Sequence, residues 1–288
     1  MRFVLTADWH IRATKPRCRI DEDWIQTQRL ALNQIADIAN SNDCPVYVVG
    51  DLFHSHSDTS FEVVQLIQEF ANSLNHGMFI LAGNHDLPHH NSSNLHKSAI
   101  GILLHCEKIN FIQNNEYVSA GNFDQETENK DIIFKHILCF PDLKSMPPNV
   151  NAVAAEDLLG EYDNAKWIFT GDYHHNFVYE NKGRHVVNSG CLIRQVSDMK
   201  DYQCGVYVID TVLNEIDFVP IVDDYDLVDD SHILRQNEKD ERIENMVDKL
   251  MDIEAVSLDF IQNIENVLLK TDVSDEIRKC VKELIYEV

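Results

Sequence analysis

The sequence has no apolar run long enough to span a membrane. Of its 288 residues 44% are hydrophobic, but they fall in short segments, whereas a transmembrane helix needs roughly 20 consecutive apolar residues. The chain also begins directly with a strand-like run, Arg2 to Thr6, and lacks the charged-then-apolar order of a signal peptide. We therefore expect a cytoplasmic protein without a membrane partner.

Closely spaced cysteine pairs are also missing. The seven cysteines are odd in number and scattered, and none forms a C-x-x-C pair. This usage disfavours a thiolate metal site and a disulfide framework. It indicates reduced, mostly buried thiols in a reducing compartment.

Basic residues are scarce, with 24 Lys and Arg against 48 Asp and Glu and a formal net charge of −24. This balance argues against a broadly adhesive nucleic-acid surface. Much of the acid lies in the last seventy residues, whereas the segment containing Arg12, Lys15, Arg17 and Arg19 is basic. That segment could contact phosphate, or it could be a solvated loop.

The periodicity of apolar residues predicts an α/β fold. Strand-like runs at 3–5, 46–49 and 78–82 alternate with helical spacing at 21–40, where Asp21 is the expected N-cap, and at 61–74. This alternation predicts a βαβαβ unit with a mainly parallel sheet covered by helices.

The remaining elements are predicted from shorter patterns. We expect a loop at 88–98, short strands at 100–140, a short helix at 151–160, strands at 167–170 and 185–187, and an antiparallel hairpin formed by 205–210 and 215–219. Beyond about residue 221 the sequence becomes acidic and helical, with periodic segments near 237–252, 255–269 and 274–287. The chain is therefore divided into two predicted domains, 1–220 and 221–288.

Four short segments place oxygen and imidazole groups at or near the ends of predicted strands. They are Asp8-Trp9-His10, Gly50-Asp51, Gly83-Asn84-His85-Asp86 and Gly171-Asp172-Tyr173-His174. The carboxyl ends of strands converge on one edge of a sheet, where α/β folds place their sites. Each segment alone reads as an ordinary turn, but together they predict a site for two Mn²⁺, Zn²⁺ or Fe ions, a donor set poorly suited to Ca²⁺.

The residue types suggest roles within such a site. Asp51 is the natural bridge between two ions, because a carboxylate has two oxygens to share. Asp8 and His10 would ligate one ion together, and Asn84 would supply an amide oxygen. His85 is free to act on a leaving oxygen, and we expect Asp86 to orient it by accepting its other ring proton.

The order D-x-H, G-D, G-N-H-D, a later histidine and G-x-x-H resembles the calcineurin-like metallophosphoesterase superfamily. Within it, Val49 to His54 is similar to the G-D-L-F-H segment of the Mre11/SbcD nuclease family, and the stretch Arg19 to Ala39 also resembles that family. Asn188-Ser189-Gly190 and Arg194 are similar to the family's segment after the last motif. The resemblance covers about residues 1–220, and the size fits phage recombination endonuclease subunits. It implies a two-sheet sandwich built on the βαβαβ unit and flanked by helices, with a small C-terminal helical or cap region.

The resemblance also implies a ligand set. One ion would be held by Asp8, His10, Asp51 and His174, and the second by Asp51, Asn84, His136 and the residue at 172. His85 would protonate or stabilise the leaving 3′-oxygen, and His54 would position the DNA end. Mn²⁺ is the usual activator, with Mg²⁺, Zn²⁺ or Fe as alternatives. Arg12, Arg17 and Arg194 are the candidate substrate contacts.

One position departs from the family pattern. The family's last motif is G-H-x-H, whereas this chain has Asp172 at the first imidazole position. Aspartate is shorter and more anionic than imidazole, so we expect a second site that is weaker for Zn²⁺ or Fe. His175 could compensate only if its side chain turned inward.

Three functions follow from these expectations. The first is a metal-dependent DNA exo/endonuclease, a homodimer acting with an SMC-type coiled-coil ATPase in recombination, repair or replication, in the host cytoplasm if a phage encodes it. The second is a small-molecule phosphodiesterase or protein phosphatase of the same superfamily, which suits the acidic charge better. The third is a non-enzymatic subunit whose metal site has decayed, with Asp172 as a first sign. The C-terminal region would cap the site or bind the ATPase.

Overall fold

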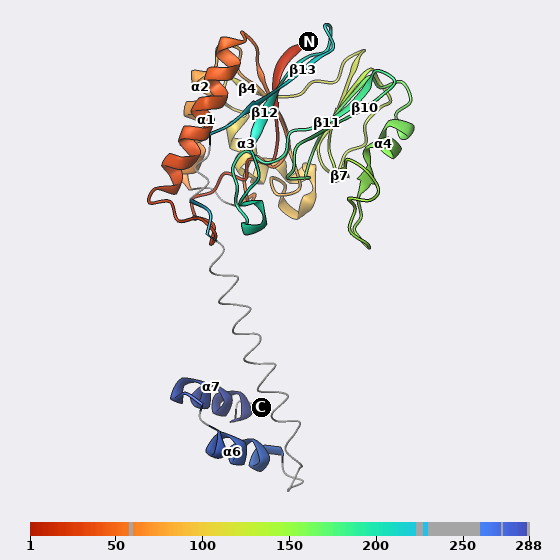
Figure 1. The fold of residues 1–288 in the computed structure, drawn as a ribbon. Coiled ribbons are helices and arrows are strands. Elements are labelled where there is room, and N and C mark those ends of the chain that lie inside the picture. Colours follow the sequence, from red (N-terminus) through yellow and green to blue (C-terminus); the bar gives the residue numbers. More distant parts are fainter. Residues whose placement is uncertain (58–59, 223–226, 230–259, 272, 287–288) are drawn as a thin grey trace. The chain divides into compact units, whose positions relative to one another are not determined.

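The computed structural model describes residues 1–57, 60–222, 227–229, 260–271 and 273–286. The chain divides into two compact units, Met1–Asp229 and Asp230–Val288. The first unit is an α/β fold with two mixed sheets flanked by helices, which confirms the predicted fold class (Figure 1). In the second unit the structure describes helices α6 (Phe260–Lys270) and α7 (Asp275–Tyr286).

The first sheet contains the predicted βαβαβ unit. Its strands, in sheet order, are β13 (Glu215–Pro220), β12 (Gly205–Asp210), β1 (Arg2–Thr6), β2 (Val46–Val49), β3 (Met78–Leu81) and β4 (Ile109–Phe111). Strands β1 to β4 run parallel, and β12 is antiparallel to both β1 and β13, so the predicted hairpin is confirmed. The connecting helices are α1 (Trp24–Ser41) and α2 (Phe61–Ser73).

The second sheet is formed by the middle of the chain. Its strands, in sheet order, are β10 (Phe177–Asn181), β11 (Arg184–Asn188), β9 (Trp167–Gly171), β6 (Ile132–His136) and β5 (Val118–Gly121). All neighbours are parallel except β10 and β11, which form an antiparallel pair. A short parallel pair, β7 (Cys139–Phe140) and β8 (Val153–Ala154), precedes helix α4 (Ala155–Glu161).

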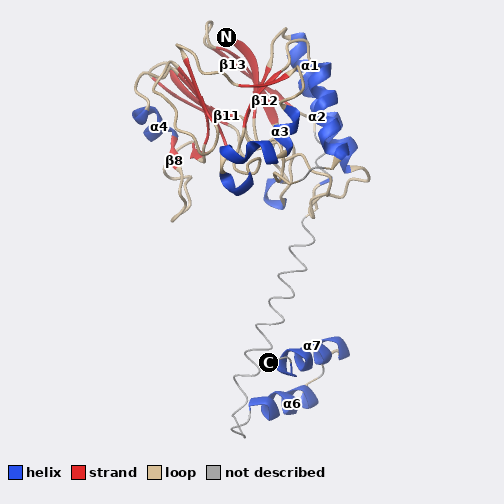
Figure 2. Ribbon diagram, turned by 180° about the vertical axis from the view of Figure 1, so that it is seen from behind, coloured by secondary structure: helices blue, strands red, loops and turns tan. Residues whose placement is uncertain are grey.

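The two sheets pack face to face through large apolar side chains. Phe3 of the first sheet lies 5.2 Å from Phe169 and 5.8 Å from Phe134 of the second, measured between ring centroids. Helices α1 and α2 cover the outer face of the first sheet and α4 that of the second (Figures 1 and 2). Burial of apolar surface on both sides of each sheet is the main stabilising contribution. It also holds the carboxyl ends of strands from both sheets at one edge.

The start of α1 differs from the prediction. Asp23, not Asp21, caps the helix by accepting the backbone N–H of Gln26 at 2.9 Å. Asp21 instead accepts two hydrogen bonds of 2.7 Å from the guanidinium of Arg19, with both side chains buried. A buried arginine requires such a partner, and this requirement displaced the expected cap by two residues.

Several local elements also differ. Residues predicted as a loop at 88–98 form two 3₁₀ turns, Pro88–His90 and Ser92–Lys97, and helix α3 (Ala99–Leu103) stands where short strands were expected. Strand β10 was not predicted, because its sequence, three apolar or aromatic residues followed by two polar ones, does not alternate apolar and polar residues. The helical segment predicted at 237–252 lies outside the described residues. Among the helices that the structure describes, none is long and apolar enough to cross a membrane.

Candidate metal centre

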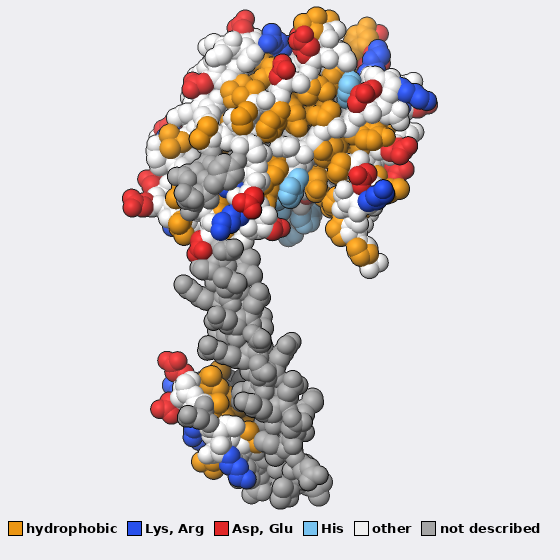
Figure 3. All heavy atoms as spheres, in the orientation of Figure 1, with side chains coloured by type: hydrophobic (Ala, Val, Ile, Leu, Met, Phe, Trp, Pro, Cys, Tyr) orange, Lys and Arg blue, Asp and Glu red, His pale blue; other side chains and the backbone are white. Residues whose placement is uncertain are grey.

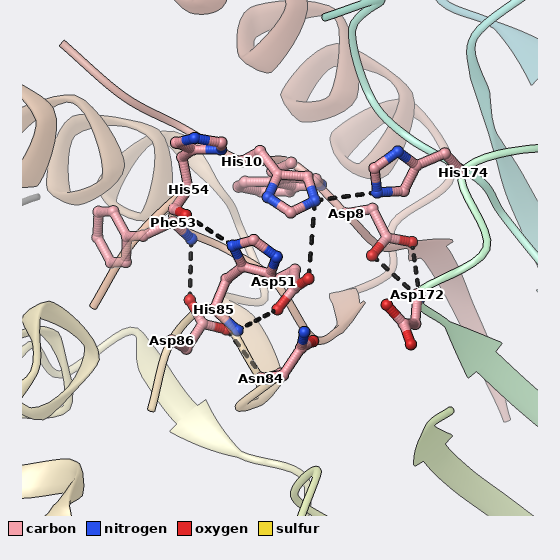
Figure 4. Close-up of polar contacts among 12 residues, drawn as sticks. Asp8, His10, Asp51, Phe53, His54, Asn84, His85, Asp86, Asp172 and His174 are labelled. Atoms are coloured by element: carbon pink, nitrogen blue, oxygen red, sulfur yellow. Dashed lines mark hydrogen bonds and ion pairs between the residues drawn. The ribbon is translucent and has the colours of Figure 1, made fainter. Parts of the chain in front are cut away.

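The four predicted segments and His136 meet at the carboxyl edge of both sheets (Figure 4). Asp8 and His10 follow β1, Asp51 follows β2, Asn84 follows β3, His136 ends β6, and Asp172 and His174 follow β9. Figure 3 shows histidine side chains gathered at one place on the surface of this unit. The sandwich therefore brings together residues that are up to 166 positions apart in the sequence.

The loops after β1 and β2 hold each other in an extended ladder beyond the sheet. The backbone N–H groups of Asp8, His10 and Ile11 donate to the carbonyls of Gly50, Asp51 and Leu52 at 3.0–3.1 Å. Asp8, His10 and Asp51 adopt left-handed backbone conformations, with φ of 50°, 46° and 51°. Such conformations cost energy for residues other than glycine and concentrate at functional sites. Here they turn three candidate ligands toward one point.

One group of candidate ligands is formed by Asp8, His10 and His174. Their ligand atoms all lie within 4.8 Å of one another. The Nε2 atoms of His10 and His174 are only 3.1 Å apart, and His10 Nε2 is 3.6 Å from Asp51 Oδ2. Burial lowers the pKa of His10 to about 3 and also lowers that of His174, so each imidazole is neutral and can offer a nitrogen lone pair. Two neutral imidazoles and a carboxylate converging in this way fit a divalent cation.

A second group contains Asp8, Asp51 and His136, again with ligand atoms within 4.8 Å. His136 Nδ1 is 2.8 Å from the carbonyl of Val49, and since a carbonyl only accepts, Nδ1 carries a proton. Its Nε2 is therefore directed at Asn84 Oδ1, 3.1 Å away, and at Asp51 Oδ2, 3.5 Å away. A backbone carbonyl that fixes the tautomer in this way is typical of histidine ligands.

Asp51 belongs to the second group and also lies close to His10 of the first. Its Oδ2 atom is buried and has no hydrogen-bond partner among the described residues, although it is about equally far from His10 Nε2 and His136 Nε2. A buried carboxylate oxygen without a partner is costly. The imidazoles, the amide oxygen and this carboxylate oxygen thus have the chemistry to hold divalent cations, and Asp51 would contribute to holding them.

The electrostatics of these candidate ligands also fit a site for positive charge. Burial lowers the pKa of His136, but the charge of Asp51 and, less strongly, those of Asp8 and Asp172 raise it to about 10. The pKa of Asp51 is held well below its usual range, because His136 and His10 outweigh the effect of burial. A proton on His136 consequently supplies the positive charge that these buried carboxylates need.

Asp172 contributes in an unexpected way. Its backbone N–H donates to both carboxylate oxygens of Asp8, at 3.0 and 3.1 Å. Its own carboxylate lies beside that of Asp8 (Figure 4), but it belongs to none of the compact ligand groups found among the described residues. Burial and Asp51 raise its pKa, whereas His136 opposes them. His175 does not turn inward to compensate, since its exposed ring packs 4.9 Å from that of Tyr202.

The predicted role of Asp86 needs correction. Asp86 does not orient His85: its completely buried carboxylate accepts the backbone N–H groups of Leu52, Phe53 and Gly83 at 2.9–3.1 Å. Burial and the charge of Asp51 raise the pKa of Asp86 to about 7, while these three hydrogen bonds act in the opposite direction. Asp86 therefore ties the loop after β2 to the end of β3 and positions Asp51 indirectly.

His85 is oriented by another residue of the predicted set. Its Nδ1 is 2.8 Å from the backbone carbonyl of His54, so Nδ1–H donates there and Nε2 is left for chemistry. The His54 ring, in turn, accepts a hydrogen bond from the Arg12 guanidinium, with 2.9 Å between Nη1 and Nε2. His10, His54, His85 and Arg12 line a surface pocket of about 130 Å³.

The other two predicted substrate contacts differ from Arg12. Arg17 is exposed in the basic loop. Arg194 is completely buried and donates a hydrogen bond to the carbonyl of Lys200. Arg194 therefore has a structural role and is not a substrate contact as predicted, because its side chain has no surface that a substrate could reach.

Two supports of the site were not predicted from the sequence. Gln195 Nε2 donates to the carbonyls of Trp9 and His10 at 3.0 and 3.2 Å, and nothing in its local sequence suggests this. Gly83 packs so closely that a Cβ at this position would overlap the Asp51 carboxylate and lie 2.5 Å from its backbone nitrogen. The glycine before Asn84 was the available signal for that close approach.

The chain is similar to several known proteins. A curated relative, the probable exonuclease subunit 1 of Escherichia phage T5, is 27% identical over 88 residues, which is 30% of this chain and 26% of the relative. The match thus spans about a quarter of that relative's length.

Solved structures are similar at low identity. They include an archaeal phosphodiesterase (14% identity, TM-score 0.41, 76% of this chain and 99% of the other). They also include a putative 5′-nucleotidase from Staphylococcus aureus (15%, 0.48, 83% and 58%) and a dimetal phosphatase from Danio rerio (11%, 0.44, 72% and 91%). The model of the calcineurin-like phosphoesterase family matches residues 1–176. Because this match covers more than half of the chain and contains most of the converging residues, the protein belongs to the calcineurin-like phosphoesterase family.

Proposed function

We propose that this phosphoesterase is a metal-dependent DNA exo/endonuclease that hydrolyses phosphodiester bonds. The observation that carries the proposal is the chain of contacts from Arg12 through His54 to His85 at the rim of the ligand set. It places a guanidinium, which binds phosphate, and an imidazole with a fixed tautomer on the same side of the pocket. The local similarity to a phage exonuclease subunit supports the same proposal.

His85 has the geometry of a proton donor to the leaving oxygen. Its Nδ1–H is held by the His54 carbonyl, which leaves Nε2 facing the pocket. Arg12 would add positive charge next to a bound phosphodiester. Two divalent cations, with Mn²⁺ as the proposed pair, would supply Lewis-acid polarisation and a water of lowered pKa. Asp8, His10, Asp51 and His174 would hold one, and Asp51, Asn84, His136 and Asp172 the other.

The proposal extends to partners. We infer a homodimer acting on DNA with an SMC-type coiled-coil ATPase, and the local similarity to an exonuclease subunit supports the presence of a partner. The C-terminal helices α6 and α7 are the candidate region for capping the site or binding that ATPase.

A second function is favoured by two observations. The pocket beside the ligand set measures only about 130 Å³, and the net charge is −24. Both suit a small phosphodiester, which needs no basic track along the surface. A small-molecule phosphodiesterase is therefore the competing proposal.

Incubation of the purified protein with Mn²⁺ and end-labelled single- and double-stranded DNA tests the proposal. We expect cleavage that falls by a factor of about 10² to 10⁴ in His85→Ala, with unchanged metal content, whereas His105→Ala, an exposed histidine away from the site, retains full activity. Turnover of bis-p-nitrophenyl phosphate without DNA cleavage, with and without the ATPase, would favour the second function. Inactivity of the wild type and of His85→Ala on every substrate, together with low metal content, would indicate a decayed site.

A further inference from the structure

An aromatic side chain at the metal edge takes no part in the proposed ligand set. Phe123 follows β5 and retains 38% of its surface exposed to solvent. Its backbone N–H donates to the carbonyl of Ala82 at 3.0 Å, and Asn122 Oδ1 accepts the N–H of Ala82 at 2.8 Å. These two hydrogen bonds fix the loop after β5 to the end of β3. The ring is therefore presented by a constrained backbone.

The ring of Phe123 packs against His136, a member of the second candidate ligand group. Its centroid lies 6.3 Å from that of His136, at an interplanar angle of 65°, and 6.0 Å from that of His90. His90 in turn donates from Nδ1 to the backbone carbonyl of Asn84 at 3.0 Å. Phe123 thus lies next to one candidate ligand, His136, and is linked through His90 to the backbone of another, Asn84.

The two sides of the ligand set differ in chemistry. Arg12, His54 and His85 lie on the side of His10, whereas Phe123 and His90 lie on the side of His136, and Asp51 Oδ2 stands between His10 and His136. A phosphodiester held at this set would meet a guanidinium on one side. On the other side it would meet an exposed aromatic ring.

We propose that Phe123 stacks on the nucleobase next to the scissile phosphate, so that the substrate is a nucleic acid with an intact base at that position. This inference rests on the proposed nuclease function. Stacking of a base on an aromatic side chain tolerates any sequence, because every base has a π-face. It also supplies affinity without a basic surface, which suits a chain with a net charge of −24. One such contact changes binding by roughly tenfold.

The alternative is that Phe123 only shields His136 from water. The two roles differ in what they depend on. Shielding acts on every substrate alike, whereas stacking acts only on a substrate that carries a base. A substrate without that base separates them.

The test uses oligonucleotides with a single cleavable phosphodiester, all other linkages being methylphosphonates, and with either a base or an abasic residue on each side of that bond. With wild-type protein and Mn²⁺, we expect kcat/KM to be about tenfold lower for one of the abasic substrates. Phe123→Ala should lose about tenfold on the intact substrate and nothing on that abasic one, and Phe123→Trp should retain the preference. Binding, read by fluorescence anisotropy in a His85→Gln background, should show the same pattern.

The matched control is Tyr117→Ala. Tyr117 is an exposed aromatic residue at the opposite end of the same strand β5, and its removal should change neither substrate. Equal losses on intact and abasic substrates in Phe123→Ala, or no loss on either, would overturn the stacking role while leaving the nuclease proposal intact. Absence of cleavage of every oligonucleotide by the wild-type protein would refute the nuclease function, and the stacking role with it.

Discussion

Binding of a divalent cation should release a proton from His136. In the metal-free site both ring nitrogens of His136 face acceptors, the Val49 carbonyl and Asn84 Oδ1, and the charge of Asp51 raises its pKa to about 10. A cation at Nε2 must displace the proton there, so metal affinity depends on pH. The other two imidazoles behave differently, because burial lowers the pKa of His10 to about 3 and also lowers that of His174.

The magnitude follows from these values. At pH 7, about three units below the pKa of His136, removal of its proton weakens metal binding by roughly a thousandfold, or about 4 kcal/mol. Between pH 6.5 and 9 the logarithm of the association constant should therefore rise by about one per pH unit on account of His136. Burial raises the pKa of Asp8, and the charge of His136 opposes this rise.

Calorimetric titration of the metal-free protein with Mn²⁺ checks this prediction. Measurements in two buffers of different ionisation enthalpy give the number of protons released directly. We expect His136→Gln, which retains an oxygen near the position of Nε2, to release one proton fewer than the wild type at pH 7.5. Equal release by the two proteins would refute the assigned protonation of His136.

The remaining predictions concern the frame of the site. In the metal-free protein the raised pKa of His136 adds stability in full below about pH 6.5 and loses it as the pH rises through about 10, so melting curves of His136→Gln should vary less with pH over that range. Asp86→Ala leaves three buried N–H groups without a partner and should lower the free energy of unfolding by about 3 kcal/mol or more in urea titrations; an unchanged midpoint would contradict its role as a tie. Asp172→His should tighten Zn²⁺ binding in competition with a chromogenic chelator, and a weaker affinity would show that its carboxylate is the better ligand. Gly83→Ala should reduce Mn²⁺ content by displacing Asp51, whereas Gly160→Ala, where a Cβ meets nothing within 4 Å, should leave it unchanged.

The fold was predictable because its signals are local. Apolar runs at β1, β2 and β3 with amphipathic helices between them specify a βαβαβ unit, and right-handed crossovers leave few other arrangements. Errors arose where a tertiary contact overrode a local preference. Asp21 is a good capping residue, but the buried guanidinium of Arg19 took its carboxylate and left the cap to Asp23.

The candidate site shows the same division. Asp8, Asp51 and Asn84 were predictable because side chains that follow parallel strands share one edge. The role of Asp86 was not, since the three N–H groups that it accepts come from two loops whose approach depends on the packed sheet. The burial of Arg194 likewise depends on residues distant in the chain, such as Arg19, whose guanidinium lies against the Arg194 carbonyl.

By itself, the sequence determined the βαβαβ order in the first sheet and the chemical types of the groups at the metal edge, because these depend on residue identity and on short-range periodicity. Only the tertiary structure decided which atoms face each other. The Val49 carbonyl fixes the His136 tautomer, the His54 carbonyl orients His85, and the Asp172 backbone holds Asp8. Each of these hydrogen bonds joins segments distant in the sequence, and its geometry is set by the packing of the two sheets.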